Sequence, residues 1–356
     1  MVVLDQLLES CVFHDGSDLH IKAGSPPLIR VYGDLLPLDM EPLTPEQARF
    51  LCFSALSEVQ KMRFNEDYEM DFAYELKGIA RFRGNTYLQR GNVGGAFRVI
   101  PYRIKTMEEL GLPPSCKDFA QRPRGLVLVT GPAGSGKSTT QAAMIDFINR
   151  TDPVHIITIE DPVEFVHTDI QAVINQRELE TDTMSFPNAL RAALREDPDV
   201  ILIGEMRDLE TIKLAITAAE TGHLVFGTLH TTDSIQTVDR VIDVFPPHQQ
   251  QQVRMQMAVN LLGVVSQNLI KKADGSGRIP AFEVLVAVSA VRNLIREGKT
   301  HQISSILQTG QRHGMQTLDQ SLADLVNARV VTYEEALSRA GNQNEFKALV
   351  SGTLNN

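Results

Sequence analysis

The chain contains few cysteines and no long apolar run. Its three cysteines, Cys11, Cys52 and Cys116, are odd in number and far apart, which fits reduced thiols better than a disulfide framework or a zinc site. No segment approaches the roughly 20 apolar residues that a membrane-spanning helix needs, and the N-terminal stretch lacks the basic region of an export signal. The sequence therefore predicts a protein that is neither exported nor inserted into a membrane.

Positive charge is also scarce. Lys and Arg total 34 against 44 Asp and Glu, and the formal net charge of -10 has the wrong sign for a protein whose main partner is nucleic acid. The net charge does not exclude local basic patches. The length of 356 residues and a hydrophobic fraction of 43% predict a globular chain of about two domains.

A phosphate-binding loop is the most specific motif in the chain. An apolar run at 125–130 precedes it and a helical pattern at 140–148 follows it, as the motif requires. Lys137 is expected to reach the β- and γ-phosphates and Ser138 to bind Mg²⁺, and the alternative is a glycine-rich turn at a helix start. The expected nucleotide-binding residues are Gly131, Pro132, Ala133, Gly134, Ser135, Gly136, Lys137, Ser138 and Thr139.

Apolar periodicity divides the chain into three parts. Residues 1–100 mix alternating strands with helices and predict a small α+β domain, and the proline-containing residues 101–123 predict a linker. Residues 124–356 begin with apolar strands that alternate with helices, which is typical of a parallel sheet, and beyond Pro246 the pattern predicts mainly helix. The expected fold class is α/β.

Polar residues follow the later strands, at the sheet edge where ligands bind in such folds. Glu160, Asp161 and Glu164 come after one strand, and either Glu164 or Glu160 is expected to orient the attacking water, with Asp161 near the waters of Mg²⁺. The alternative is a loop of solvated acids. Glu205 ends the next strand and is expected in the outer shell of Mg²⁺, unless it only favours the following helix start, a reading that suits Asp208 better.

Two histidines bracket a further strand. His223 precedes it and His230 follows it. Singly, histidines at strand ends are often hydrogen-bonded polar residues. Together they form a candidate sensor that detects the γ-phosphate and reports it to a neighbouring subunit.

With these clusters in this order, the sequence resembles the bacterial secretion-superfamily ATPases, and within them the type IV pilus retraction ATPases, the PilT family. The similarity extends over nearly the full length and includes a C-terminal signature at 291–297, Val-Arg-Asn-Leu-Ile-Arg-Glu. This sequence departs from the family pattern at Val291, where isoleucine is usual, at Ala133, where threonine is usual, and at Gln141, where leucine is usual.

The resemblance implies a RecA-like P-loop NTPase domain preceded by a PAS-like α+β N-terminal domain. It also implies a cytoplasmic homohexamer at the cytosolic face of the inner membrane, peripheral rather than integral, that hydrolyses ATP with Mg²⁺. The expected partners are the inner-membrane pilus platform protein and the pilus base machinery, without direct contact to nucleic acid. Arg83 and Arg98 are candidates for positive charge supplied to a neighbouring subunit's site, with surface strand arginines as the alternative.

Other functions remain open at this point. An extension or type II secretion ATPase of the same superfamily usually carries a four-cysteine zinc insertion, and no cysteine follows Cys116. An accessory retraction paralogue departs from the Arg-Asn-Leu-Ile-Arg part of this signature, which this chain keeps at 292–296. A non-hydrolysing nucleotide-dependent interaction module and a nucleic-acid translocase are the rivals from other classes.

Overall fold

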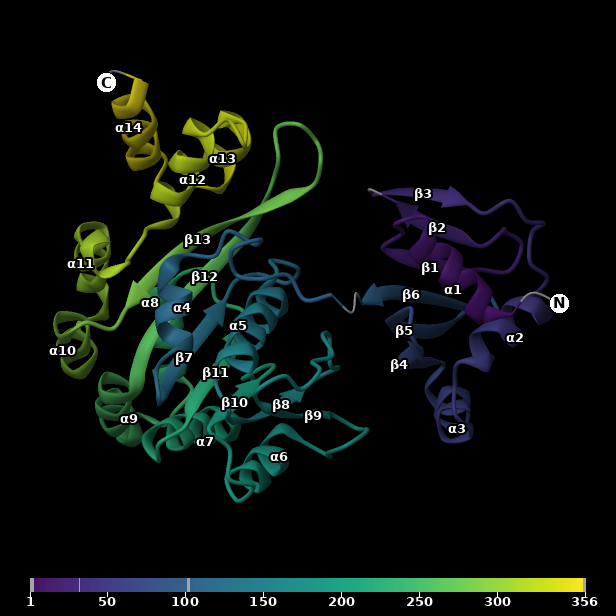
Figure 1. Cartoon of the computed structure of the whole chain (residues 1–356), viewed down its shortest axis with the longest axis horizontal. Coiled ribbons are helices and arrows are strands. Elements are labelled where there is room, and N and C mark those ends of the chain that lie inside the picture. The colour runs from purple at the N-terminus through teal and green to yellow at the C-terminus, as the bar shows by residue number, and fades with distance from the viewer. Residues whose placement is uncertain (1–2, 32, 101–102, 355–356) are drawn as a thin grey trace. The chain divides into compact units, whose positions relative to one another are not determined.

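The computed structural model describes residues 3–31, 33–100 and 103–354. The chain divides into two compact units, Met1–Arg103 and Ile104–Asn356. Both units are shown in Figure 1. Pro101 and Tyr102, at the start of the predicted linker, lie outside the described residues. Residues 104–123 of that stretch belong to the second unit, and Met107, Cys116 and Phe119 are buried in its core.

The first unit is an α+β domain with one antiparallel sheet in the order β3-β2-β1-β6-β5-β4. Buried residues alternate with more exposed ones along β5, and Phe82 of this strand packs with Leu19, Phe97 and residues of the helices in one core. The expected PAS-like architecture is confirmed. Its elements are α1 Leu4–Phe13, β1 Asp18–Ile21, β2 Leu28–Val31, β3 Asp34–Pro37, α2 Pro45–Ser54, α3 Glu58–Asp67, β4 Glu69–Leu76, β5 Ala80–Gln89 and β6 Asn92–Ile100.

The second unit is built on a seven-stranded sheet in the order β13-β12-β7-β11-β10-β8-β9. Every neighbouring pair is parallel except β12 and β13, as expected for a RecA-like fold. The strands are β7 Gly125–Thr130, β8 His155–Glu160, β9 Val173–Glu178, β10 Val200–Ile203, β11 Leu224–Leu229, β12 Leu261–Lys271 and β13 Arg278–Val286.

Helices cover both faces of this sheet. Leu126 and Leu128 of β7 pack into one core and Val127 into another, because successive strand residues point to opposite faces. The apolar run of β7 is therefore buried on both sides. The helices are α4 Pro114–Ala120, α5 Lys137–Thr151, α6 Phe186–Ala193, α7 Leu209–Glu220, α8 Ser234–Asp243, α9 Pro247–Asn260, α10 Ser289–Glu297, α11 Ile303–Thr309, α12 Leu318–Asn327, α13 Tyr333–Arg339 and α14 Gln343–Leu354.

The prediction of mainly helix after Pro246 is wrong for residues 261–286. These residues form the long β12–β13 hairpin at one edge of the sheet (Figure 1). β12 also pairs in parallel with β7, which precedes it by more than a hundred residues, and local periodicity does not register such a partner. From Ser289 onward the chain is largely helical, as expected.

Candidate active site

The phosphate-binding loop joins β7 to α5 at the carboxyl edge of the sheet. Gly131, Gly134 and Gly136 have φ of 139°, 73° and 91°, which residues with a side chain rarely adopt. Gly136 is the N-cap of α5, and no side chain caps that helix end. The first backbone N–H groups of α5 are therefore available to a phosphate group.

Lys137 and Ser135 complete the fit of this loop to a phosphate. The Lys137 Nζ donates to the carbonyl oxygens of Gly131 at 2.9 Å and Pro132 at 3.0 Å. Burial lowers the pKa of Lys137, and the nearby carboxylates of Glu205 and Glu164 oppose that shift. The Ser135 Oγ is buried without a hydrogen-bond partner among the described residues, so the loop presents an unused polar atom as well as a partly buried cation.

Gln267 of β12 holds the phosphate-binding loop through its side-chain amide. The sequence pattern did not single out this residue. Its Nε2 donates to the Ser135 carbonyl oxygen at 2.7 Å, and its Oε1 accepts from Thr140 Oγ1 at 2.8 Å. A Cβ at Gly131 would lie 2.3 Å from the Gln267 carbonyl oxygen. Since β12 was expected to be helical, no sequence signal placed Gln267 beside this loop.

The three acids at the end of β8 have different surroundings: Glu160 is the last residue of the strand, and Asp161 and Glu164 follow it. Asp161 is exposed and lies near Arg207, while Glu164 is half-buried and near Lys137. Among the described residues, no hydrogen bond or ion pair engages the Glu164 carboxylate. Glu164 is therefore the acid of this group that is free to hold a water.

Glu160 faces the protein interior instead. Its Oε1 accepts from Thr158 Oγ1 at 2.6 Å and from Gln176 Nε2 at 3.2 Å, and the backbone N–H of Glu164 donates to the same carboxylate. Burial raises the pKa of Glu160 to about 7 against these donors. Because these partners occupy the Glu160 carboxylate, we favour Glu164 over Glu160 as the acid that orients the attacking water, and this choice stays a prediction.

Glu205 follows β10 and lies beside the end of β11. Its Oε1 is 2.9 Å from His230 Nε2 and forms an ion pair with Arg207. Burial alone would raise the pKa of Glu205, but Arg207 and His230 outweigh it, and the pKa lies below its ordinary value. The structure thus places Glu205 and His230 in direct contact, as their positions at strand ends predict. Arg207 also contacts Glu205, and the strand-end pattern did not single it out.

His223 does not join this group within the chain. It precedes β11, whereas the phosphate loop and His230 follow their strands, so about 20 Å of strand separates the two histidines. The His223 Nδ1 bonds the Ala218 carbonyl oxygen at 2.9 Å. The two histidines therefore lie at opposite ends of β11, and their joint role in sensing the γ-phosphate and reporting it to a neighbouring subunit stays a prediction.

Arg83 and Arg98 lie in the first unit and are directly opposite each other on β5 and β6. Both side chains are exposed. Arg98 Nε also forms an ion pair with Asp18 Oδ1 at 2.9 Å. Their action in a neighbouring site stays a prediction.

A family model described as type II/IV secretion system protein matches residues 102–339. The chain belongs to this family. PilT of Pseudomonas aeruginosa, described as a type IV pilus retraction ATPase, is 51% identical over 95% of this chain and 98% of its own length. A twitching motility protein of Neisseria gonorrhoeae is 53% identical over 89% of this chain and 84% of its own length. Among type II/IV secretion system proteins, the chain is therefore of the PilT type.

Solved structures agree with this assignment. A crystal structure of the pilus retraction motor PilT with bound ADP has a TM-score of 0.91 and 46% identity, covering 97% of this chain and 99% of that chain. DotB of Legionella pneumophila has a TM-score of 0.81 and 27% identity, covering 98% of this chain and 95% of that chain. As in the PilT family, the chain is an ATP-hydrolysing enzyme with a nucleotide-binding site. Among the residues that the structure describes, no helix is long and apolar enough to cross a bilayer.

The two departures from the PilT pattern near the loop differ in their surroundings. Ala133 is exposed, so its side chain leaves the loop backbone unconstrained. Gln141 of α5 is only 3% exposed, and its Nε2 has no hydrogen-bond partner among the described residues. A buried unpaired donor of this kind costs about 1–3 kcal/mol.

Gln141→Leu is therefore expected to stabilise this PilT-type protein. The substitution removes the unpaired donor at similar volume, so we expect the free energy of unfolding to rise by about 1 kcal/mol or more. Urea denaturation followed by circular dichroism measures the change. Gln252→Leu, at an exposed site on α9, is the matched control and should leave stability unaltered. Equal stability of Gln141→Leu and the wild type would show that the amide is satisfied in solution.

Proposed function

We propose that this chain is the ATP-hydrolysing motor of type IV pilus retraction and twitching motility. One observation carries the proposal: Lys137, the free Glu164 carboxylate and the Glu205–His230 pair meet at one edge of the sheet. This arrangement combines a phosphate cradle with a carboxylate that can act on water. The similarity to retraction ATPases over nearly the whole length supplies the cellular role.

Each residue in the site has a separate task. The α5 N-terminus and Lys137 hold the phosphates, and Ser138 is proposed to bind Mg²⁺, with Glu205 in the outer shell. The metal ion would supply neutralisation of phosphate charge. Glu164 accepts a proton from the attacking water or orients it, since its carboxylate is free and near Lys137. His230 contacts Glu205 directly and is placed to detect a change at the γ-phosphate.

The working assembly is proposed to be a homohexamer. Arg83 or Arg98 would then supply positive charge to the site of an adjacent subunit, and His223 would transmit the nucleotide state across the subunit boundary. We place the ring in the cytoplasm at the inner-membrane face. Its partners there would be the pilus platform protein and the pilus base.

Two alternatives are less well supported. An extension or secretion ATPase usually has four zinc-binding cysteines, and here Cys11, Cys52 and Cys116 are all buried with pKa values raised by burial. A non-hydrolysing interaction module would not need an unpaired carboxylate beside the phosphate loop.

Two measurements on the full chain test the proposed function. The purified protein should release phosphate from ATP in the presence of Mg²⁺, without stimulation by nucleic acid. Expressed in a piliated bacterium that lacks its own retraction ATPase, it should restore pilus retraction and twitching. Turnover without restored retraction would favour another secretion ATPase, and absence of turnover would favour the interaction module.

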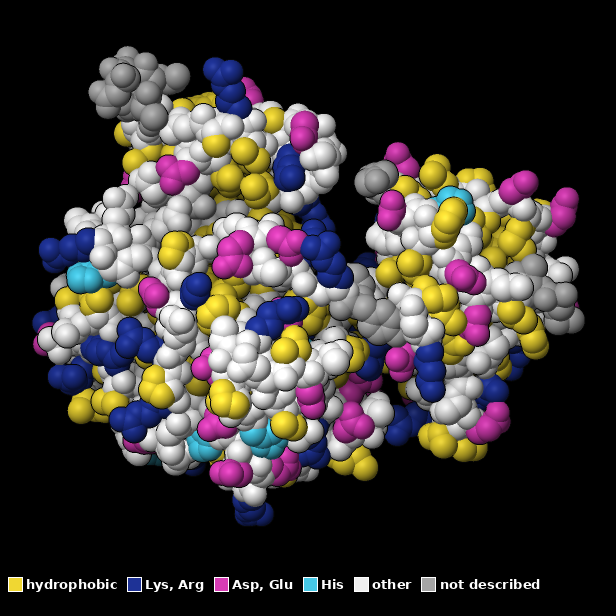
Figure 2. All heavy atoms as spheres, viewed as in Figure 1, with side chains coloured by type: hydrophobic (Ala, Val, Ile, Leu, Met, Phe, Trp, Pro, Cys, Tyr) yellow, Lys and Arg dark blue, Asp and Glu magenta, His cyan; other side chains and the backbone are white. Residues whose placement is uncertain are grey.

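The C-terminal signature offers a separate test of force transmission. Arg292 of α10 donates to the carbonyl oxygens of Ala287 and Ala258 at 2.7 Å each, and also to that of Val259, so it caps the end of α9. Arg296 is exposed and makes no such contact. Figure 2 shows Lys and Arg side chains gathered on the part of the second unit where α9 and α10 lie.

Arg296→Ala is expected to keep ATP turnover within about twofold, because exposed substitutions rarely change stability by more than about 0.5 kcal/mol. Pilus retraction in cells should nevertheless fall. Arg292→Ala should instead lower the free energy of unfolding by roughly 1.5–3 kcal/mol, since bonds to a charged donor are lost. Lys299→Ala, at an exposed lysine two residues beyond the end of this helix, is the control. Normal retraction with Arg296→Ala would remove this side chain from the transmission path.

A further inference from the structure

The loop that carries Glu164 has almost no backbone hydrogen bonds of its own. Residues 161–172 connect β8 to β9 without regular helix or strand, so their polar backbone groups need other partners. We call this segment the Glu164 loop. The N–H groups of Gln171 and Ala172 donate to the Asn149 carbonyl oxygen. Further partners are side chains of β9 and α5.

Gln176 of β9 holds the Glu164 loop at two points. Its Nε2 donates to the Phe165 carbonyl oxygen at 2.8 Å, and its Oε1 accepts from the His167 backbone N–H at 2.8 Å. The same Nε2 also donates to Glu160 Oε1 at 3.2 Å. One amide group therefore ties together the loop beyond Glu164 and the acid that receives the backbone N–H of Glu164.

The other side of Glu164 is held as well. The backbone N–H of Val163 donates to Glu178 Oε2 at 3.1 Å, and Glu178 is two residues after Gln176 on the same strand. Side chains of alternate β9 residues thus fix positions 163, 165 and 167. The Glu164 carboxylate, which lies between them, remains unengaged among the described residues.

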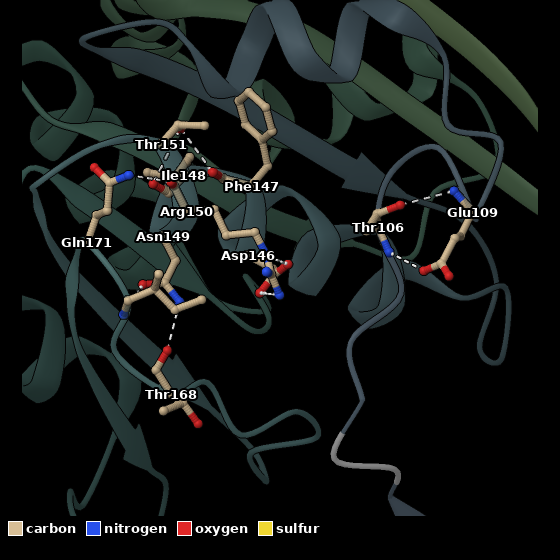
Figure 3. Close-up of polar contacts among 11 residues, drawn as sticks. Thr106, Glu109, Asp146, Phe147, Ile148, Asn149, Arg150, Thr151, Thr168 and Gln171 are labelled. Carbon is tan, nitrogen blue, oxygen red and sulfur yellow. Dashed lines mark hydrogen bonds and ion pairs between the residues drawn. The ribbon is translucent and has the colours of Figure 1, made fainter.

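Asn149 anchors the far end of the loop to the helix that starts at Lys137 (Figure 3). It is 1% exposed, its Nδ2 donates to the Thr168 carbonyl oxygen at 2.9 Å, and its Oδ1 accepts from the Ile170 backbone N–H at 3.0 Å. The Gln171 Nε2 donates to the Arg150 carbonyl oxygen at 2.6 Å in the same view. The phosphate-binding helix and the Glu164 loop are therefore connected through three side-chain hydrogen bonds.

We propose that Gln176 is a positioning residue for ATP hydrolysis, which fixes the backbone around Glu164 so that its carboxylate meets the attacking water. The inference rests on the proposed role of Glu164. Gln176 does not touch the nucleotide in this scheme; it acts through the loop. A misplacement of 1 Å at a reacting group can cost about 100-fold in rate. Loss of the Gln176 hydrogen bonds should therefore affect the chemical step rather than nucleotide binding.

The test replaces Gln176 by Met, which keeps the volume but loses all three hydrogen bonds. We expect kcat to fall about 10- to 100-fold, while KM and the Kd for ATP stay within about threefold. Gln176→Glu keeps an acceptor for the His167 N–H but has no donor. Its kcat should lie between that of Gln176→Met and that of the wild type. Asn175→Ala is the matched control, since Asn175 is exposed on the same strand and bonds His155 Nε2 instead of the loop.

A double substitution separates positioning from general damage. In a Glu164→Gln background, Gln176→Met should cause little further loss of kcat, because both changes act on one group. A full additive loss, a kcat within twofold of wild type for Gln176→Met alone, or a parallel fall of thermal stability and ATP affinity would each overturn the proposal.

Amide hydrogen exchange keeps this test independent of the motor function. The His167 backbone N–H should exchange faster in Gln176→Met than in wild type. Unchanged exchange would show that Gln176 does not hold the loop. If the wild-type chain hydrolysed no ATP, the proposed function would fail while the exchange result still decided whether Gln176 holds the loop.

Discussion

Lys137→Ala is expected to abolish ATP binding while the second unit remains folded. The ammonium group would bond two phosphates, and each hydrogen bond to a charged group is worth about 1.5–3 kcal/mol. The loss corresponds to a roughly 100-fold or greater rise in Kd. In the structure the only hydrogen bonds of Nζ go to the Gly131 and Pro132 carbonyl oxygens among the described residues, so little of the fold depends on it.

Isothermal titration with a slowly hydrolysed ATP analogue measures this effect, and circular dichroism checks the fold. Lys213→Ala removes an exposed lysine of α7 and serves as the control. Tight nucleotide binding by Lys137→Ala would contradict the assignment of residues 131–139 as the phosphate-binding loop.

Glu164→Gln is expected to leave ATP binding within about threefold and to lower hydrolysis about 10²- to 10⁴-fold, the usual contribution of a general base. The amide has almost the same size but cannot accept the proton of the attacking water. No described partner of the carboxylate would be lost, so stability should be unaltered.

Single-turnover measurements of phosphate release separate this loss from slower product release. Glu196→Gln, which alters an exposed acid paired with Arg177, is the matched control. If Glu164→Gln kept half of the wild-type turnover, Asp161 and Glu205 would become the candidates for the base.

The phosphate loop and its neighbours could be predicted from the sequence because their information is local. The glycines of 131–136 and Lys137 form one contiguous motif between a strand and a helix. Glu205 and His230 follow parallel strands, and such strands end at the same edge of a sheet, so their contact followed from topology alone.

The remaining features depend on partners that are distant in sequence. Glu160 and Glu164 look equivalent in the sequence, and only the irregular loop between them decides that one turns inward and the other stays free. The pairing of β12 with β7, and with it the role of Gln267, required a non-local contact. His223 and His230 looked like a pair, although the strand between them carries them to opposite edges.

The support of the phosphate loop by β12 also has a consequence for biosynthesis. β7 pairs with β11 and β12, which both come after it in the chain, and the Gln267 amide that bonds the loop is the later part of this arrangement. During translation the loop leaves the ribosome before either strand exists. A nascent chain that ends before Leu261 contains the whole binding motif but lacks the strand that shapes it. We therefore expect the chain to become competent to bind ATP late in translation, once the β12–β13 hairpin has joined the sheet.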